Sequence, residues 1–114
     1  MLLDASRGCA GDPADDVSCM AINYIFFALG RPGAWHSAFR DLWLNFWESY
    51  AKRRSDPELL EVCAPFLAWR ALLLCNPLLY PDVSEKDRDR LLSFVEQALA
   101  VRRLDLSSAD AVFA

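Results

Sequence analysis

The segment from Gly11 to Leu29 constrains the fold more than any other part of the chain. Asp12 is a good helix N-cap because its carboxylate accepts hydrogen bonds from first-turn amides, and Pro13 follows where a missing N–H costs nothing. The residues after Asp16 leave no continuous polar stripe, so the helix that they form should be buried on most sides. We therefore expect residues 13–29 to form a central helix that the rest of the chain covers.

The remaining sequence predicts three further helices, at residues 34–54, 57–75 and 84–103. Segments rich in glycine or proline separate the helices, and such segments end a helix because they cannot continue its hydrogen bonding. The length suits one domain with a real core. We expect a single all-α domain over residues 1–114, with four main helices around the first and a short strand-like segment at residues 1–4.

Aromatic residues are concentrated in the second predicted helix. They favour a core role, while an aromatic wall for a substrate or a partner helix is the alternative. Two further apolar residues, Leu44 and Trp47, are placed at the boundary of this face. The side chains that recur at the spacing of one helical face are Trp35, Phe39, Leu42, Trp43, Phe46 and Tyr50.

Two residues stand out in the third predicted helix. Pro65 has no backbone N–H for the Glu61 carbonyl, so it should kink the helix or divide it in two. Arg70 is the lone charge in an apolar run, and we expect it to pair with a carboxylate such as Asp41 or Glu48.

The segments around the fourth helix are expected to pack on the domain. Ser84 should cap the helix, and residues 104–114 either fray or dock through Val112 and Phe113. The connection at residues 76–81 should be anchored by Leu78, Leu79 and Tyr80. The residues of the fourth helix expected to face inward are Leu91, Leu92, Val95, Ala98 and Leu99.

Composition argues against several classes of function. A net charge of −4 gives no basic face for nucleic acid, and polar residues interrupt every apolar run well short of a membrane span. No signal peptide is recognisable, so we expect a cytoplasmic protein without membrane contact. Cys19, Cys63 and Cys75 are interpreted as small buried residues in a reducing compartment, and His36 as a surface or boundary residue.

A pattern near the N-terminus resembles a known family. The pattern consists of two apolar residues and an acid, then a short loop, then Gly-Asp-Pro and a second acid. This order resembles that of the aminoglycoside phosphotransferase and choline-kinase-like family. Residues 66–81 and 86–94 also resemble late helices of one bacterial branch of that family, and the resemblance extends over residues 1 to about 100. The positions that match its motif are Asp4, Gly11, Asp12, Pro13 and Asp16.

The resemblance implies a role for each of these positions. Asp4 would end a strand in the ATP cleft and hold Mg²⁺, so Mg and ATP are the implied cofactors of a complete enzyme. Structural roles fall to Gly11, Asp12, Pro13 and Asp16. The nucleotide loop, the phosphate-binding lysine and the catalytic-loop Asp and Asn would all precede Asp4. We therefore expect the C-terminal helical part of a small-molecule phosphotransferase, with no cofactor and no activity on its own.

An independent helical protein that self-associates is the alternative function. Apolar residues make up 54% and aromatic residues 12% of the chain, which is high for a domain with no partner. We expect a homo-oligomer or a missing N-terminal kinase lobe to cover the N-terminal strand and the aromatic second helix, with a small-molecule acceptor as a further partner. An upstream reading frame that encodes the catalytic-loop Asp and Asn would favour the phosphotransferase.

Overall fold

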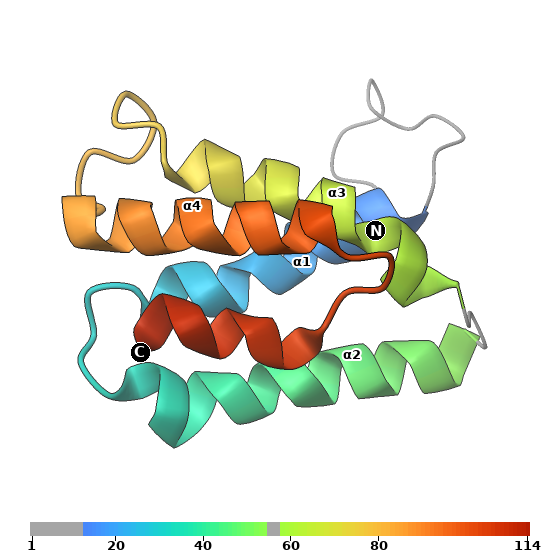
Figure 1. The fold of residues 1–114 in the computed structure, drawn as a ribbon. Coiled ribbons are helices and arrows are strands. Elements are labelled where there is room, and N and C mark those ends of the chain that lie inside the picture. The colour runs from blue at the N-terminus through green and yellow to red at the C-terminus, as the bar shows by residue number, and fades with distance from the viewer. Residues whose placement is uncertain (1–12, 55–57) are drawn as a thin grey trace, which may run out of the picture.

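The computed structural model describes residues 13–54 and 58–114, and over these residues the protein is helical and has no strand (Figure 1). The prediction of an all-α fold with four main helices is confirmed. The strand-like segment predicted at residues 1–4 lies outside the described residues. The elements are α1 (Pro13–Ala28), the π-helical turn η2 (Trp35–Phe39), α2 (Arg40–Arg54), α3 (Leu59–Leu74), α4 (Glu85–Ala100) and the 3₁₀ helix η3 (Leu106–Phe113).

The helix boundaries follow from local chemistry. The turn after α1 contains Gly30 and Gly33 at φ values of +73° and +77°, a conformation that side chains with a Cβ rarely adopt. Ser84 caps α4 as predicted, because its Oγ accepts a hydrogen bond of 3.1 Å from the Asp87 amide. Helix α4 ends at Ala100, three residues earlier than predicted.

The early end of α4 lets the chain return across α3. Leu104 is buried, and its amide donates a hydrogen bond of 2.7 Å to the carbonyl of Leu60. Residues 106–113 then form η3, which packs against α4 and runs alongside α2 (Figure 1). Of the two outcomes predicted for the tail, docking is the one observed, and Val112 is fully buried.

Helix α1 packs against α3, α2 and η2, and α3 in turn packs against α4. The central position predicted for the first helix is therefore correct, but its burial on most sides is not. Met20 is 60% exposed and Phe27 is 50% exposed, so one face of α1 meets solvent. The buried face consists of Ala14, Val17, Ser18, Ala21, Ile22, Ile25 and Ala28.

The buried face of α2 differs from the predicted one because of the π turn. Trp43 and Trp47 are buried, whereas Leu42 is exposed. In η2 the amide of Arg40 donates to the carbonyl of Trp35, five residues back rather than four. A π turn holds one additional residue, so it changes which later positions align with Trp35. The single α-helical phase assumed from the sequence does not hold across this turn.

Helix α3 is continuous through Pro65, so of the two outcomes predicted for this residue, a kink or a division, the division does not occur. Pro65 lies on the exposed side of α3, and Glu61 is exposed as well. The carbonyl that loses its amide partner therefore belongs to a solvent-facing part of the helix, where breaking one backbone bond costs least.

Two predictions of apolar packing, one for the connection before α4 and one for α4 itself, are partly wrong. In the connection before it, Leu78 is 90% exposed and Leu79 is mostly exposed, while Tyr80 packs edge-on against Phe26 with ring centroids 5.2 Å apart. Of the predicted anchors only Tyr80 packs on the domain, and the buried Val83 is a second anchor that was not predicted. In α4 itself, Leu92 and Leu99 point outward, and the buried residues are Leu91, Phe94, Val95 and Ala98.

Candidate functional site

The residues singled out by the family resemblance are only partly described. Asp4, Gly11 and Asp12 lie outside the described residues. Pro13 is the first residue of α1, as predicted, and Asp16 is exposed in the first turn of that helix.

An ion pair ties the first turn of α1 to α3. Arg70 Nη2 lies 3.0 Å from Oδ1 of Asp15. The expectation that Arg70 pairs with a carboxylate is correct, but the partner is neither Asp41 nor Glu48. Both of those acids are exposed on α2, whereas α1 and α3 pack directly against each other. The pair holds the N-terminal end of α1, next to the segment that resembles the kinase motif.

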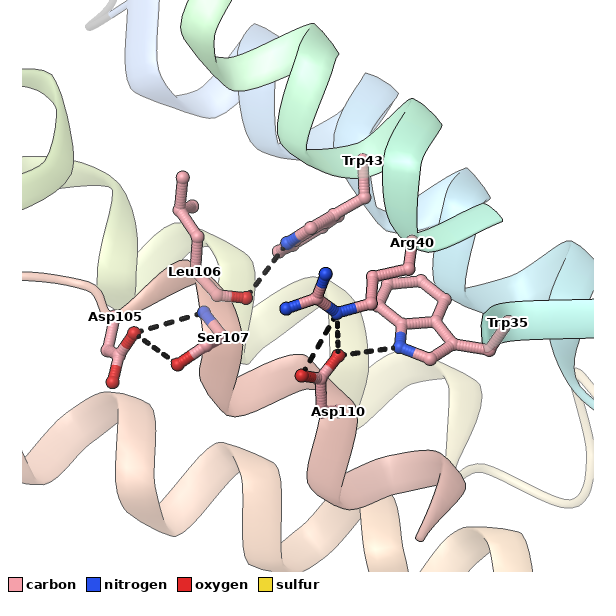
Figure 2. A network of polar contacts seen from close by, with 7 residues as sticks. All are labelled: Trp35, Arg40, Trp43, Asp105, Leu106, Ser107 and Asp110. Atoms are coloured by element: carbon pink, nitrogen blue, oxygen red, sulfur yellow. Dashed lines mark hydrogen bonds and ion pairs between the residues drawn. The ribbon is translucent and has the colours of Figure 1, made fainter. Parts of the chain in front are cut away.

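A second polar network joins the start of α2 to the C-terminal helix (Figure 2). The indole Nε1 of Trp35 donates a hydrogen bond of 2.8 Å to Oδ1 of Asp110. The Nε of Arg40 donates to the same oxygen at 2.9 Å and to Oδ2 at 3.1 Å. One carboxylate therefore accepts hydrogen bonds from the buried indole at the start of the π turn and from the guanidinium directly after it.

A backbone contact continues this network along α2 (Figure 2). The indole of Trp43 donates a hydrogen bond of 3.0 Å to the carbonyl of Leu106. Asp105 caps η3 by accepting from the amide of Ser107 at 3.0 Å and from its hydroxyl at 2.7 Å. Sequence reasoning missed this network, although an Asp-x-Ser cap and an acid among small and apolar residues were signals that could have indicated a docked helix.

The pKa of Asp110 lies below its ordinary value of 3.8. Burial alone would raise this pKa, because it disfavours the charged form. The hydrogen bonds from Trp35 and Arg40, with the positive charges of Arg40 and His36, outweigh burial and favour the carboxylate. Asp110 therefore remains ionised wherever the domain is folded near neutral pH.

Replacing Asp110 with asparagine should give a pH-dependent loss of stability. A lowered folded-state pKa stabilises the domain fully above the unfolded-state pKa, and this contribution disappears as pH falls through the folded-state value. We expect Asp110→Asn to lower the free energy of unfolding by about 1 kcal/mol at pH 7, since the pair is partly exposed, and by less at pH 3. Urea unfolding at both pH values measures this difference. The control Asp89→Asn alters an exposed carboxylate, and an Asp110→Asn effect as large at pH 3 as at pH 7 would contradict the prediction.

A cavity of about 330 Å³ lies next to this network. It is bounded by the turn at residues 30–33, by η2, by the first turns of α4 and by Phe113. The ring of Phe113 stacks on that of Trp35, with centroids 4.7 Å apart. The titratable side chains that line the cavity are Arg31, His36, Lys86, Asp87 and Arg90.

A second cavity, of about 390 Å³, lies on the other side of the same turn and is more apolar. Phe27 and Leu79, which are both at least half exposed, contribute to its lining with Tyr80 and Pro81. In this apolar groove, exposed apolar side chains gather around a hollow. On α2, Trp43 and Trp47 are buried but Leu42 is 48% exposed, and the covering of this helix by a partner stays a prediction.

The described cysteines, Cys19, Cys63 and Cys75, are free thiols. Burial raises the pKa of Cys63 to about 12 and also raises that of Cys75, so both remain protonated and unreactive. Cys19 is exposed, contrary to the prediction that it is buried. His36 is exposed, as expected.

Residues 13–54 and 58–114 contain no cluster of three His, Cys, Asp or Glu side chains arranged to hold a metal ion. None of the described helices combines the length and the hydropathy that crossing a bilayer requires. Comparison of the chain with protein-family models, with characterised proteins and with solved structures found no match.

Proposed function

We propose that residues 1–114 form the C-terminal helical part of a small-molecule phosphotransferase of the aminoglycoside type. The helix α1, which is present from Pro13 and follows Gly11 and Asp12 in the sequence, is the observation that carries the proposal. In the family that the sequence resembles, Gly-Asp-Pro opens the helix that follows the metal-binding acid. The packing of α1 against α3 and α2 supports the same role, because it makes this helix the scaffold of the domain.

Asp4 is the residue proposed to contact the reaction. A carboxylate is a suitable ligand for Mg²⁺, and in phosphoryl transfer the ion offsets charge on the nucleotide phosphates. One carboxylate does not assemble a nucleotide site, since transfer depends on several positioned groups at once. The nucleotide loop, the lysine, the catalytic Asp and its partner Asn would come from an N-terminal lobe. The helical part would contribute Asp4 and a wall of the acceptor site.

The proposal predicts opposite behaviour for the isolated chain and for the complete protein. Joined to the lobe that its upstream reading frame would encode, the chain should transfer phosphate from Mg-ATP. Asp4→Ala should then reduce transfer by at least about a hundredfold, the scale of losing one group that stabilises transition-state charge. Circular dichroism should show unchanged helix content in this variant. Calorimetry of residues 1–114 alone should detect no Mg-ATP binding.

The exposed acid Asp89 provides a matched control for this experiment. Asp89→Ala changes the net charge equally but lies on α4 and is not part of the N-terminal motif in the sequence, so it should leave transfer unchanged. Equal activity of Asp4→Ala and the unmodified complete protein would overturn the metal role. Micromolar Mg-ATP affinity of residues 1–114 alone would show that these residues assemble a nucleotide site without the lobe.

Self-association is a second candidate function, and the apolar groove around Phe27 and Leu79 favours it. Exposed apolar side chains that surround a hollow are typical of surfaces that bind a partner. In an independent helical protein, the partner that binds this groove would be a second copy of the chain. In a phosphotransferase, it would be the N-terminal lobe. The upstream reading frame separates the two, because only the phosphotransferase requires a catalytic-loop Asp and Asn there.

A further inference from the structure

Cationic side chains converge on the cavity beside the turn at residues 30–33. Arg31, Lys86 and Arg90 are cationic side chains of the lining, and Asp87 is its one carboxylate. The chain as a whole has a net charge of −4, so this surface has the opposite sign to the rest of the protein. A local concentration of unlike charge in an acidic protein attracts anions to one place.

The three cations have no carboxylate partner within the described part of the chain. Its ion pairs involve Arg40 and Arg70 instead. Arg90 Nη1 donates to the carbonyl of Val112 at 3.5 Å, which holds one side of its guanidinium and leaves its other N–H groups available. Three cations that share a lining with only one carboxylate, Asp87, repel one another, and a bound anion reduces this cost.

The cavity also has apolar walls. Ala28, Pro32 and Phe113 line it, and the stacking of Phe113 on Trp35 fixes the position of that wall. A pocket of this kind, with a few convergent charges on an apolar surface, is typical of sites for small molecules. Its volume of about 330 Å³ fits a compact ligand.

We propose that this cavity binds a small phosphorylated organic molecule, with the phosphate at the cations and the organic group against Phe113. A phosphate dianion offers three acceptor oxygens, which suit a guanidinium and an ammonium together. A nucleic acid or an anionic membrane is disfavoured, because both require a broad basic face. Exposed acids, Asp82, Glu85 and Asp89, lie on the same connection and helix. The inference is independent of the proposed phosphotransferase.

An NMR titration with phenyl phosphate tests this site. The chain has four tryptophans, and each indole N–H should give its own ¹H–¹⁵N signal. The Trp35 indole and the amides of Gly30 and Gly33 should shift in a saturable manner, with a dissociation constant of about a millimolar or tighter at low salt. The Trp69 indole, which is exposed on α3, should not shift. Affinity should fall as salt is added, since screening weakens contacts between exposed charges.

Two double variants with equal charge change provide the control. Arg31→Ser with Lys86→Ser removes two cations of the cavity, whereas Lys52→Ser with Arg53→Ser removes two exposed cations at the end of α2. Only the first should weaken binding, by at least about tenfold, the scale of losing charged hydrogen bonds. Equal weakening by both variants, or shifts that never saturate, would overturn the site. Equal affinity for inorganic phosphate would overturn the role of the apolar wall.

Discussion

Replacing Trp43 with alanine should lower the free energy of unfolding by about 4 kcal/mol, the usual cost of truncating a buried aromatic residue. Trp43 has no exposed surface, packs edge-on against Trp47 with centroids 5.6 Å apart, and contacts Trp35. The substitution opens a cavity between these rings. It also removes the only side-chain donor described for the Leu106 carbonyl, so α2 and η3 lose a direct link. Urea unfolding followed by circular dichroism measures the loss.

Trp69 offers a control with the same substitution. It also lies within a helix but is 55% exposed, so Trp69→Ala should cost no more than about 1 kcal/mol. Trp43→Phe should fall between the two, because it keeps most of the apolar volume and loses the hydrogen bond to the Leu106 carbonyl. Similar losses for Trp43→Ala and Trp69→Ala would show that Trp43 is not packed as described.

Removing residues 104–114 should destabilise the domain almost as far as unfolding it. Leu104 and Val112 are buried, and each contributes about 1.5–3 kcal/mol through the apolar surface it removes from water. The sum, about 3–6 kcal/mol, reaches the lower end of the total stability of a small domain, about 5–15 kcal/mol. Truncation also takes away Asp110, the acceptor for the Trp35 indole. We expect a large fall in the thermal midpoint and a red shift of tryptophan fluorescence.

Neighbouring residues of η3 test whether this effect comes from packing. Val112 is buried and Ala111 is exposed. Val112→Ser should therefore lower the thermal midpoint clearly, whereas Ala111→Ser should change it little. A truncated protein that unfolds at the same temperature as the full chain would contradict the structural role of η3.

The parts of the fold that were predictable from sequence are those set by short-range signals. Pro13, the glycines at 30 and 33, and Ser84 act on their immediate neighbours, and each marks a helix boundary as expected. The ends without such a signal were less accurate. Helix α4 ends at Ala100, and the chain then turns so that Leu104 is buried in a contact with α3. No glycine or proline near Ala100 indicates this end in the sequence.

The side-chain arrangement was less predictable because it depends on helical phase and on distant partners. One π turn was enough to bury Trp47 and expose Leu42. Arg70 pairs with Asp15 because α1 lies against α3, which is a property of the packing and not of spacing along the chain. The cationic cavity could not be predicted from the sequence for the same reason. Arg31 and Lys86 line one cavity only because α4 packs next to the turn after α1.

The hydrogen bond between Trp35 and Asp110 joins residues 75 positions apart, and this separation affects how the protein is made. During synthesis η3 leaves the ribosome after α1, α2, α3 and α4. These four helices therefore cannot complete their core packing until η3 is available. During that interval the indoles of Trp35 and Trp43 lack the acceptors that η3 provides. Long-range contacts of this kind form late and leave apolar surface open to aggregation. Newly synthesised chains should therefore depend on chaperones until residues 106–113 have docked.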